Sequence, residues 1–113
     1  MEEKRLNYQM RLRLFKEDKF FGPGIASLLR YVDEYKSLNK AAAHMNMAYS
    51  KAWKIIRHAE EELGFALLER KIGGAGGGGA CVTGEGRLFL EKYERFAAET
   101  QMAADEIFKK YFG

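Results

Sequence analysis

The sequence has 113 residues, of which 47% are hydrophobic and 31% charged, and this composition is ordinary for a globular protein with one hydrophobic core. The net charge of +3 and the isoelectric point near 9.0 favour a polyanionic partner, and no apolar run is long enough to span a membrane. The lone Cys81 excludes an internal disulfide, and the N-terminus is not a signal peptide. We therefore expect a single domain over residues 1–113, located in the cytoplasm.

Alternating residues near the N-terminus predict a β-hairpin. From Tyr8 to Leu14, apolar residues alternate with Gln and Arg, which is the period of two that a strand shows. A turn at Glu17-Asp18 and a short return strand from Lys19 to Phe21 would complete the hairpin. Gly22-Pro23-Gly24 then interrupts the chain, and its proline suits the first position of a helix.

Three helices are expected in the next forty or so residues. Apolar residues from Ile25 to Tyr35 recur with helical spacing. Ser37 is expected to cap a second helix from Leu38 to Met45, and Asn46 suits a tight left-handed turn. A third helix is expected from about Ala48 to Leu63. Two helices joined by so short a turn form a helix-turn-helix.

A glycine-rich hairpin is predicted after the helix-turn-helix. Short strands from Leu67 to Ile72 and from Ala80 to Thr83 flank six glycines between Gly73 and Gly79. In this position the hairpin is a wing, and a tip without side chains can approach a phosphate backbone and donate amide hydrogen bonds. The glycines also satisfy G-x-G-x-x-G, but no βαβ unit surrounds them, so nucleotide binding is not expected. The alternative is a surface loop with no function.

The chain ends in a predicted long helix, from about Gly84 to Tyr111, which Thr83 can cap. Its apolar residues recur in steps of four and three, the spacing of a coiled-coil seam. We expect this seam to join a homodimer; the alternative is that it packs on the chain's own hairpin and first helix. The predicted dimer interface contains Phe89, Tyr93, Phe96, Thr100, Ala103, Ile107 and Phe108. The predicted fold is mostly α within the α+β class: a winged helix-turn-helix with an N-terminal β-hairpin, a glycine-rich wing and a long C-terminal helix.

The order of charges along the third helix points to DNA. Its first two-thirds carry basic residues and its end carries Glu60, Glu61 and Glu62, which is the reverse of the order that the helix dipole favours. A helix whose N-terminal part enters a DNA groove needs cations there. The candidate DNA contacts are Tyr49, Ser50, Lys51, Lys54 and Arg57 on this helix, and Arg70, Lys71, Gly76, Gly77 and Gly78 on the wing.

Other conspicuous residues have less direct interpretations. Trp53 shares a face with Tyr49 but is expected mainly to pack in the core. Arg87 lies close enough to the wing in sequence to reach a phosphate. His44 and His58 lack further ligands at metal-binding spacing, and no set of catalytic groups converges. We therefore expect neither an enzyme nor a bound metal or cofactor.

Three segments resemble the DNA-binding domain of ModE-type molybdate-responsive transcription regulators. They are Gly22-Pro23-Gly24, then SLNKAAAHMNMAYSKAW, then FALLERKIGGAGGGGACVTGEG. More loosely, AEEELG followed by LLER and the T-x-x-G of residues 83–86 is similar to the LysR-type winged helix-turn-helix. The resemblance implies dimeric binding to pseudo-palindromic operators, a recognition helix that starts near Ala48, and dimerisation through long helices.

Two features depart from this pattern. Many relatives have Ser where this chain has Ala48, so Ser50 is a candidate to cap the helix instead. Full-length regulators of this type also carry C-terminal molybdate-binding domains, for which a chain ending at Gly113 has no room. Binding of molybdate by these residues is therefore not expected.

One alternative function stays open. A winged helix can lose DNA binding and dock another protein, here through the strand that contains Phe20 and Phe21 or through the aromatic C-terminal helix. The basic residues Lys51, Lys54 and Arg57 favour double-stranded DNA as the partner.

Overall fold

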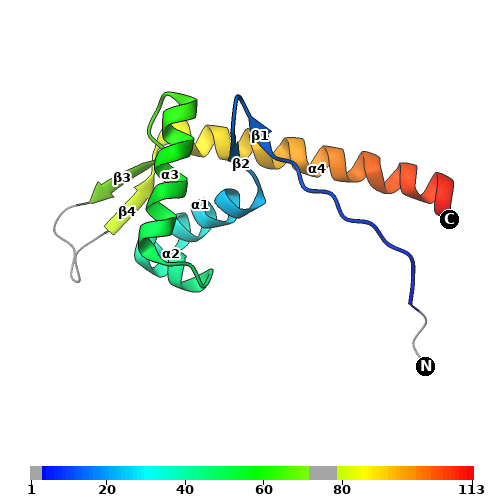
Figure 1. Cartoon of the computed structure of the whole chain (residues 1–113), viewed down its shortest axis with the longest axis horizontal. Coiled ribbons are helices and arrows are strands. Elements are labelled where there is room, and N and C mark those ends of the chain that lie inside the picture. The colour runs from blue at the N-terminus through cyan, green and yellow to red at the C-terminus, as the bar shows by residue number, and fades with distance from the viewer. Residues whose placement is uncertain (1–3, 72–78) are drawn as a thin grey trace.

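The computed structural model describes residues 4–71 and 79–113 (Figure 1). In chain order its elements are β1 (Leu14–Phe15), β2 (Lys19–Phe21), α1 (Pro23–Tyr35), α2 (Leu38–His44), α3 (Tyr49–Leu63), β3 (Leu68–Lys71), β4 (Gly79–Val82) and α4 (Gly84–Phe112). The first three helices and the β3–β4 hairpin form a body from which α4 projects. This is the mostly helical winged helix-turn-helix that the sequence predicts.

One apolar core holds the body together. The largest fully buried side chains come from every helix and from the segment before β3; they are Leu28, Leu29, Val32, Leu38, Ile56, Leu67 and Leu90. Burying a side chain of this size stabilises the fold by about 1.5–3 kcal/mol. Ala41, Ala42 and Ala52 are also buried, and such small residues allow α2 and α3 to approach closely.

The helix ends follow from local chemistry. The Ser37 hydroxyl accepts a hydrogen bond from the Lys40 N–H at 3.1 Å, so it caps α2 as expected. Asn46 has a φ of 54°, which is the left-handed turn predicted between α2 and α3. Ala48 is the residue before α3 and forms no side-chain cap. The proposed cap by Ser50 is wrong, because Ser50 already lies inside the first turn of α3.

The predicted N-terminal strand is mostly wrong. Of residues 8–14, only Leu14 is in a strand, and its partner β2 has three residues. A strand forms only where a neighbouring strand can pair with its backbone N–H and C=O groups. Instead this N-terminal segment contacts α4: the Tyr8 ring stacks on Phe108 at 4.9 Å, and the Tyr93 hydroxyl donates to the Leu12 carbonyl at 2.8 Å. The alternation therefore reflects side chains that meet a helix on one face.

The wing hairpin is antiparallel, with registers that run from Leu68 opposite Val82 to Lys71 opposite Gly79. The outer edge of β4 is held to the end of α1, because the Ala80 N–H donates to the Lys36 carbonyl at 3.1 Å. Both strands lie within a residue of the predicted bounds over the described range. Among the described helices, none is long and apolar enough to cross a membrane.

Candidate nucleic-acid interface

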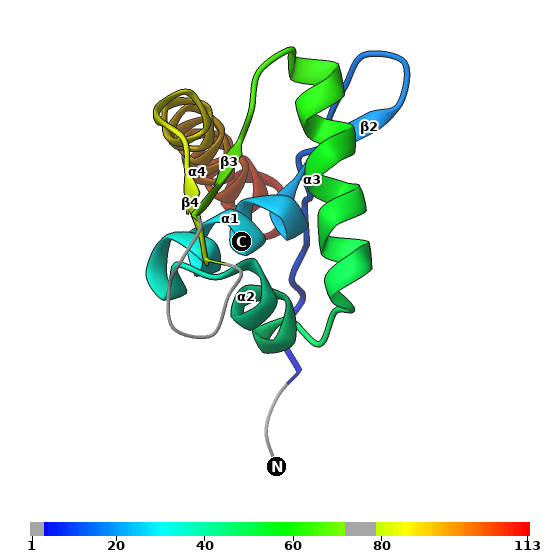
Figure 2. The same cartoon turned by 90° about the vertical axis from the view of Figure 1, so that its left-hand side faces the viewer.

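Helix α3 presents a polar face to solvent. In Figure 2 it runs along the right-hand edge of the molecule, its N-terminal turn lies beside α2, and the wing hairpin lies to its left. Its inner face is buried through Ala52, Ile56 and Ala59. Every candidate contact predicted on this helix is exposed: Tyr49, Ser50, Lys51, Lys54 and Arg57. The first turn contains no acidic residue and the last turn no basic one, as the charge order indicated.

Trp53 joins α3 to the wing. Its half-buried ring packs against the core and lies edge-on to Tyr49 at 6.3 Å between centroids. The guanidinium of Arg70, from β3, lies 4.5 Å from the indole centroid, and that of Arg57 lies 5.6 Å from it. Both are cation–π distances. The packing role predicted for Trp53 is therefore confirmed, and the indole also brings an α3 arginine and a wing arginine to one surface.

The arginine pair around Trp53 was not visible in the sequence. The signal it offered was the four-residue spacing of Tyr49, Trp53 and Arg57, which places them on one helix face. The contact with Arg70 joins residues on different elements and depends on the path of β3. Lys71, the next wing candidate, is exposed at the end of β3. The three candidate wing glycines, Gly76, Gly77 and Gly78, lie outside the described residues.

Arg87 is engaged within the fold. Its two terminal nitrogens donate to the two carboxylate oxygens of Asp33 at 3.0 and 2.5 Å, which ties α4 to α1. The hydrogen bonds and charge of Arg87 lower the pKa of Asp33 to about 2. The neighbouring Arg30 pairs with Glu94 in the same way and lowers the pKa of that carboxyl. In this structure Arg87 is therefore paired with Asp33, and its contact with a phosphate stays a prediction.

No metal centre is formed within the part of the chain that the structure describes. There, no three His, Cys, Asp or Glu side chains come together as ligands. The His44 ring instead contacts Tyr31, at 4.3 Å between centroids, and Tyr35. This histidine, the last residue of α2, packs against two aromatic rings of α1.

A helix-turn-helix followed by a two-stranded wing, with a basic outer face on the second of its two helices, defines a winged helix-turn-helix regulator. The sequence pattern of bacterial regulatory helix-turn-helix proteins of the lysR family matches residues 26–87. The chain belongs to this family. Its class is therefore that of DNA-binding transcription regulators and not that of enzymes.

The chain is also similar to ModE proteins, as the sequence motifs indicated. It is 33% identical over 95 residues to the DNA-binding transcriptional dual regulator ModE of Escherichia coli (strain K12), covering 83% of this chain and 36% of that protein. It is 29% identical over 102 residues to the transcriptional regulator ModE of Yersinia pestis, covering 90% of this chain and 37% of that protein. The chain thus spans little more than a third of the length of these relatives.

Solved structures share the fold. The DNA-binding domain of CbnR in a complex with DNA aligns with a TM-score of 0.61 and 22% identity, covering 77% of this chain and 94% of that one. The BenM DNA-binding domain with catB site 1 DNA aligns with a TM-score of 0.58 and 26% identity, covering 80% and 94%. These likenesses agree with the winged helix-turn-helix described above.

Proposed function

We propose that this chain regulates transcription by sequence-specific binding of duplex DNA, with α3 in the major groove and the wing on the neighbouring phosphate backbone. One observation carries the proposal: Lys51, Lys54 and Arg57 are all exposed on α3, the second helix of the helix-turn-helix. A basic helix face of this kind suits the major groove, which admits an α-helix. Two solved relatives of similar fold are DNA complexes, which supports the same partner.

The residues have different proposed roles. Ser50, Lys51 and Lys54, in the first half of α3, contact base edges or the phosphates that border them, with Tyr49 beside them. Arg57 is proposed to contact phosphate, as are Arg70 and Lys71 of the wing. Arg57 and Arg70 lie against Trp53, and Lys71 follows Arg70 along β3. The amides of Gly76, Gly77 and Gly78 are proposed to bind phosphate oxygens.

We further propose that the chain acts as one domain and forms a homodimer through α4. The structure divides the predicted seam in two. Phe89 and Tyr93 pack on Phe21 of their own chain, and Phe108 stacks on Tyr8. The seam residues that stay exposed are Phe96 at 51% and Ile107 at 57%, with Ala103 between them.

The exposed part of α4 is larger than the seam alone. Met102 is 69% exposed, Tyr111 68% and Phe112 65%. Of these, Tyr111 lies nearest the stripe formed by Phe96, Ala103 and Ile107, and an exposed apolar stripe of this kind marks a partner surface. Thr100 adds no free hydroxyl, since it donates to the Phe96 carbonyl at 2.7 Å. A second copy of α4 would cover this surface and place two α3 helices for two half-sites. Binding to chromosomal DNA would place the protein in the bacterial cytoplasm.

A salt titration of duplex binding tests the DNA assignment. Affinity is expected to fall steeply as salt rises, because phosphate contacts release counterions. Replacing Lys51 or Lys54 with Ala should weaken specific binding by about 1–3 kcal/mol if the side chain reads a base. Lys92→Ala, which removes an exposed charge from α4, is the control and should change little. Unchanged binding by the Lys51→Ala, Lys54→Ala double variant across the salt series would show that α3 does not enter the groove.

A further inference from the structure

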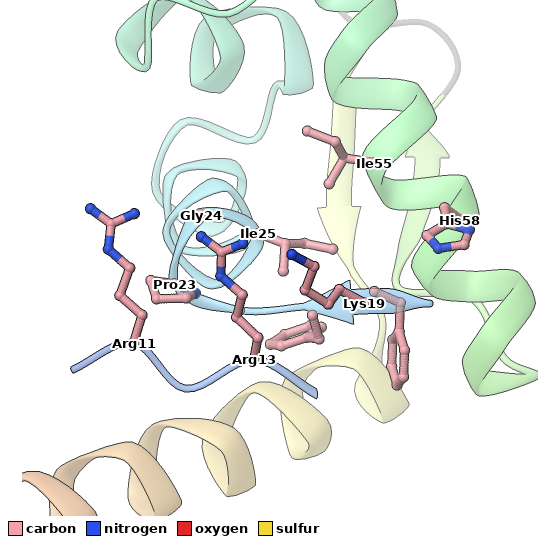
Figure 3. A pocket seen from close by; sticks show the side chains of 11 residues that line it. Arg11, Arg13, Lys19, Pro23, Gly24, Ile25, Ile55 and His58 are labelled. Atoms are coloured by element: carbon pink, nitrogen blue, oxygen red, sulfur yellow. The ribbon is translucent and has the colours of Figure 1, made fainter. Parts of the chain in front are cut away.

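A basic pocket lies on the flank of α3 that the wing does not touch. The wing meets α3 at Trp53, whereas this pocket is lined by Ile55 and His58 of α3, by the segment that precedes β1, by β2 and by the start of α1 (Figure 3). Its volume is about 340 Å³. Figure 3 shows the side chains of Arg11, Arg13 and Lys19 extending around this space.

The three cations of the pocket differ from those that hold the fold together. Arg30, Lys36 and Arg87 each pair with a carboxylate. Arg11, Arg13 and Lys19 are exposed and form no ion pair within residues 4–71 and 79–113. No acidic side chain of the described chain lines the pocket. Like charges around one space repel each other, and an anion would relieve that repulsion.

The pocket is continuous with the proposed DNA-binding face of α3. Lys51, Ile55 and His58 follow one another in steps of four and three, so they form one stripe along the helix. Lys51 stands at the proposed groove end of this stripe, and the other two residues line the pocket. The stripe therefore leads from the proposed base-reading turn to the free cations of the N-terminal segment.

We propose that Arg11, Arg13 and Lys19 bind DNA backbone phosphates on the side of the major groove opposite to the wing. The proposal rests on the proposed function, since it needs α3 in the groove. The wing on one flank and the basic pocket on the other would then hold the two phosphate walls between which α3 lies. The family pattern starts at residue 26, so these three cations are an addition to the helix-turn-helix itself.

The test compares two charge-matched double variants. Arg11→Gln with Arg13→Gln removes two charges from the pocket, and Lys109→Gln with Lys110→Gln removes two from the last turn of α4, at the far end of the molecule (Figure 1). Duplex affinity is measured by fluorescence anisotropy from about 0.05 to 0.3 M salt. Each lost phosphate contact should reduce the log–log salt slope by about 0.9 and weaken binding about five-fold at 0.15 M salt. The α4 variant should retain the slope of the unmodified protein.

The outcomes separate this inference from the function on which it rests. If the unmodified protein binds duplex and both variants share its salt slope, the pocket does not contact DNA. If the unmodified protein does not bind duplex at all, the proposed function fails and the inference fails with it.

A calorimetric titration with inorganic phosphate tests whether the pocket binds a free phosphate ion instead of the DNA backbone. Saturable phosphate binding that disappears in the arginine variant, with duplex binding unchanged, would overturn the DNA assignment in favour of a free anion. Lys19→Gln gives an independent variant if the double arginine variant does not fold, which circular dichroism would reveal; it should lower the slope by about one contact.

Discussion

Replacing Gly86 with Ala should destabilise the domain through a clash at one point. Gly86 lies in the first turn of α4, where a Cβ would stand 2.8 Å from the Leu67 carbonyl oxygen, 3.1 Å from the Leu67 Cα and 2.9 Å from the Thr83 hydroxyl. Two of these atoms belong to the backbone, so no side-chain rotation relieves the contact. Either α4 or the segment before β3 has to move.

The size of the effect follows from two opposing terms. Overpacking of a core contact costs about 1–3 kcal/mol. Alanine in a helix recovers about 0.5–1 kcal/mol relative to glycine. The central values leave a net loss of about 1 kcal/mol, which corresponds to roughly 4–5 °C in the midpoint of thermal unfolding for a chain of this length.

Gly84→Ala is the matched control. Gly84 lies two residues earlier in the same turn, and an added Cβ there meets nothing within 4 Å. This variant should be as stable as the unmodified protein or slightly more so. Urea unfolding followed by far-ultraviolet circular dichroism measures both. Equal stability of the two alanine variants would show that α4 and residue 67 are not in the close contact described.

Three further predictions concern charge, assembly and ligands. Asp33 has a pKa of about 2 in the folded chain against an ordinary value of 3.8, so the ionised carboxylate stabilises the fold fully above pH 4 and less as the pH falls toward 2. Thermal unfolding over this pH range should show a loss of about 1–2 kcal/mol in the free energy of unfolding, and Asp33→Asn should lack this loss. Ile107→Asp should leave a folded monomer with weaker operator binding, and sedimentation of the unmodified protein as a monomer at tens of micromolar would refute the α4 dimer. Calorimetry with molybdate and sulfate should give no saturable difference for these 113 residues, and a micromolar molybdate site would contradict this.

Local patterns predicted most of the helical fold. Helical spacing and capping chemistry located the four helices to within a residue or two, because each signal depends on neighbours in the sequence: Ser37 and Thr83 both cap the helices assigned to them. Asn46 and Gly64 adopt the left-handed conformation at the predicted helix ends. The basic residues that the charge order singled out on α3, Lys51, Lys54 and Arg57, are all exposed.

Distant partners explain what the sequence could not reveal. The alternation near Tyr8 resembles a strand, but whether a strand forms depends on a partner that is not present beside it. The ion pair of Arg87 joins residues 54 positions apart, so no local sequence pattern predicts that Asp33 pairs with its guanidinium. The basic pocket likewise assembles from the N-terminal segment, β2 and α3, which no single window of sequence brings together.

The wing and the C-terminal helix are connected by one residue. β4 ends at Val82, α4 begins at Gly84, and the Thr83 hydroxyl between them donates to the Ala66 carbonyl at 2.6 Å. In the proposed dimer each wing would therefore turn with its own α4. The helix is about 43 Å long at 1.5 Å per residue, so a 10° change in the crossing angle at its middle would shift its first turn by about 4 Å. This shift is close to the rise of one base pair. The angle between two helices would thus select the number of base pairs between half-sites.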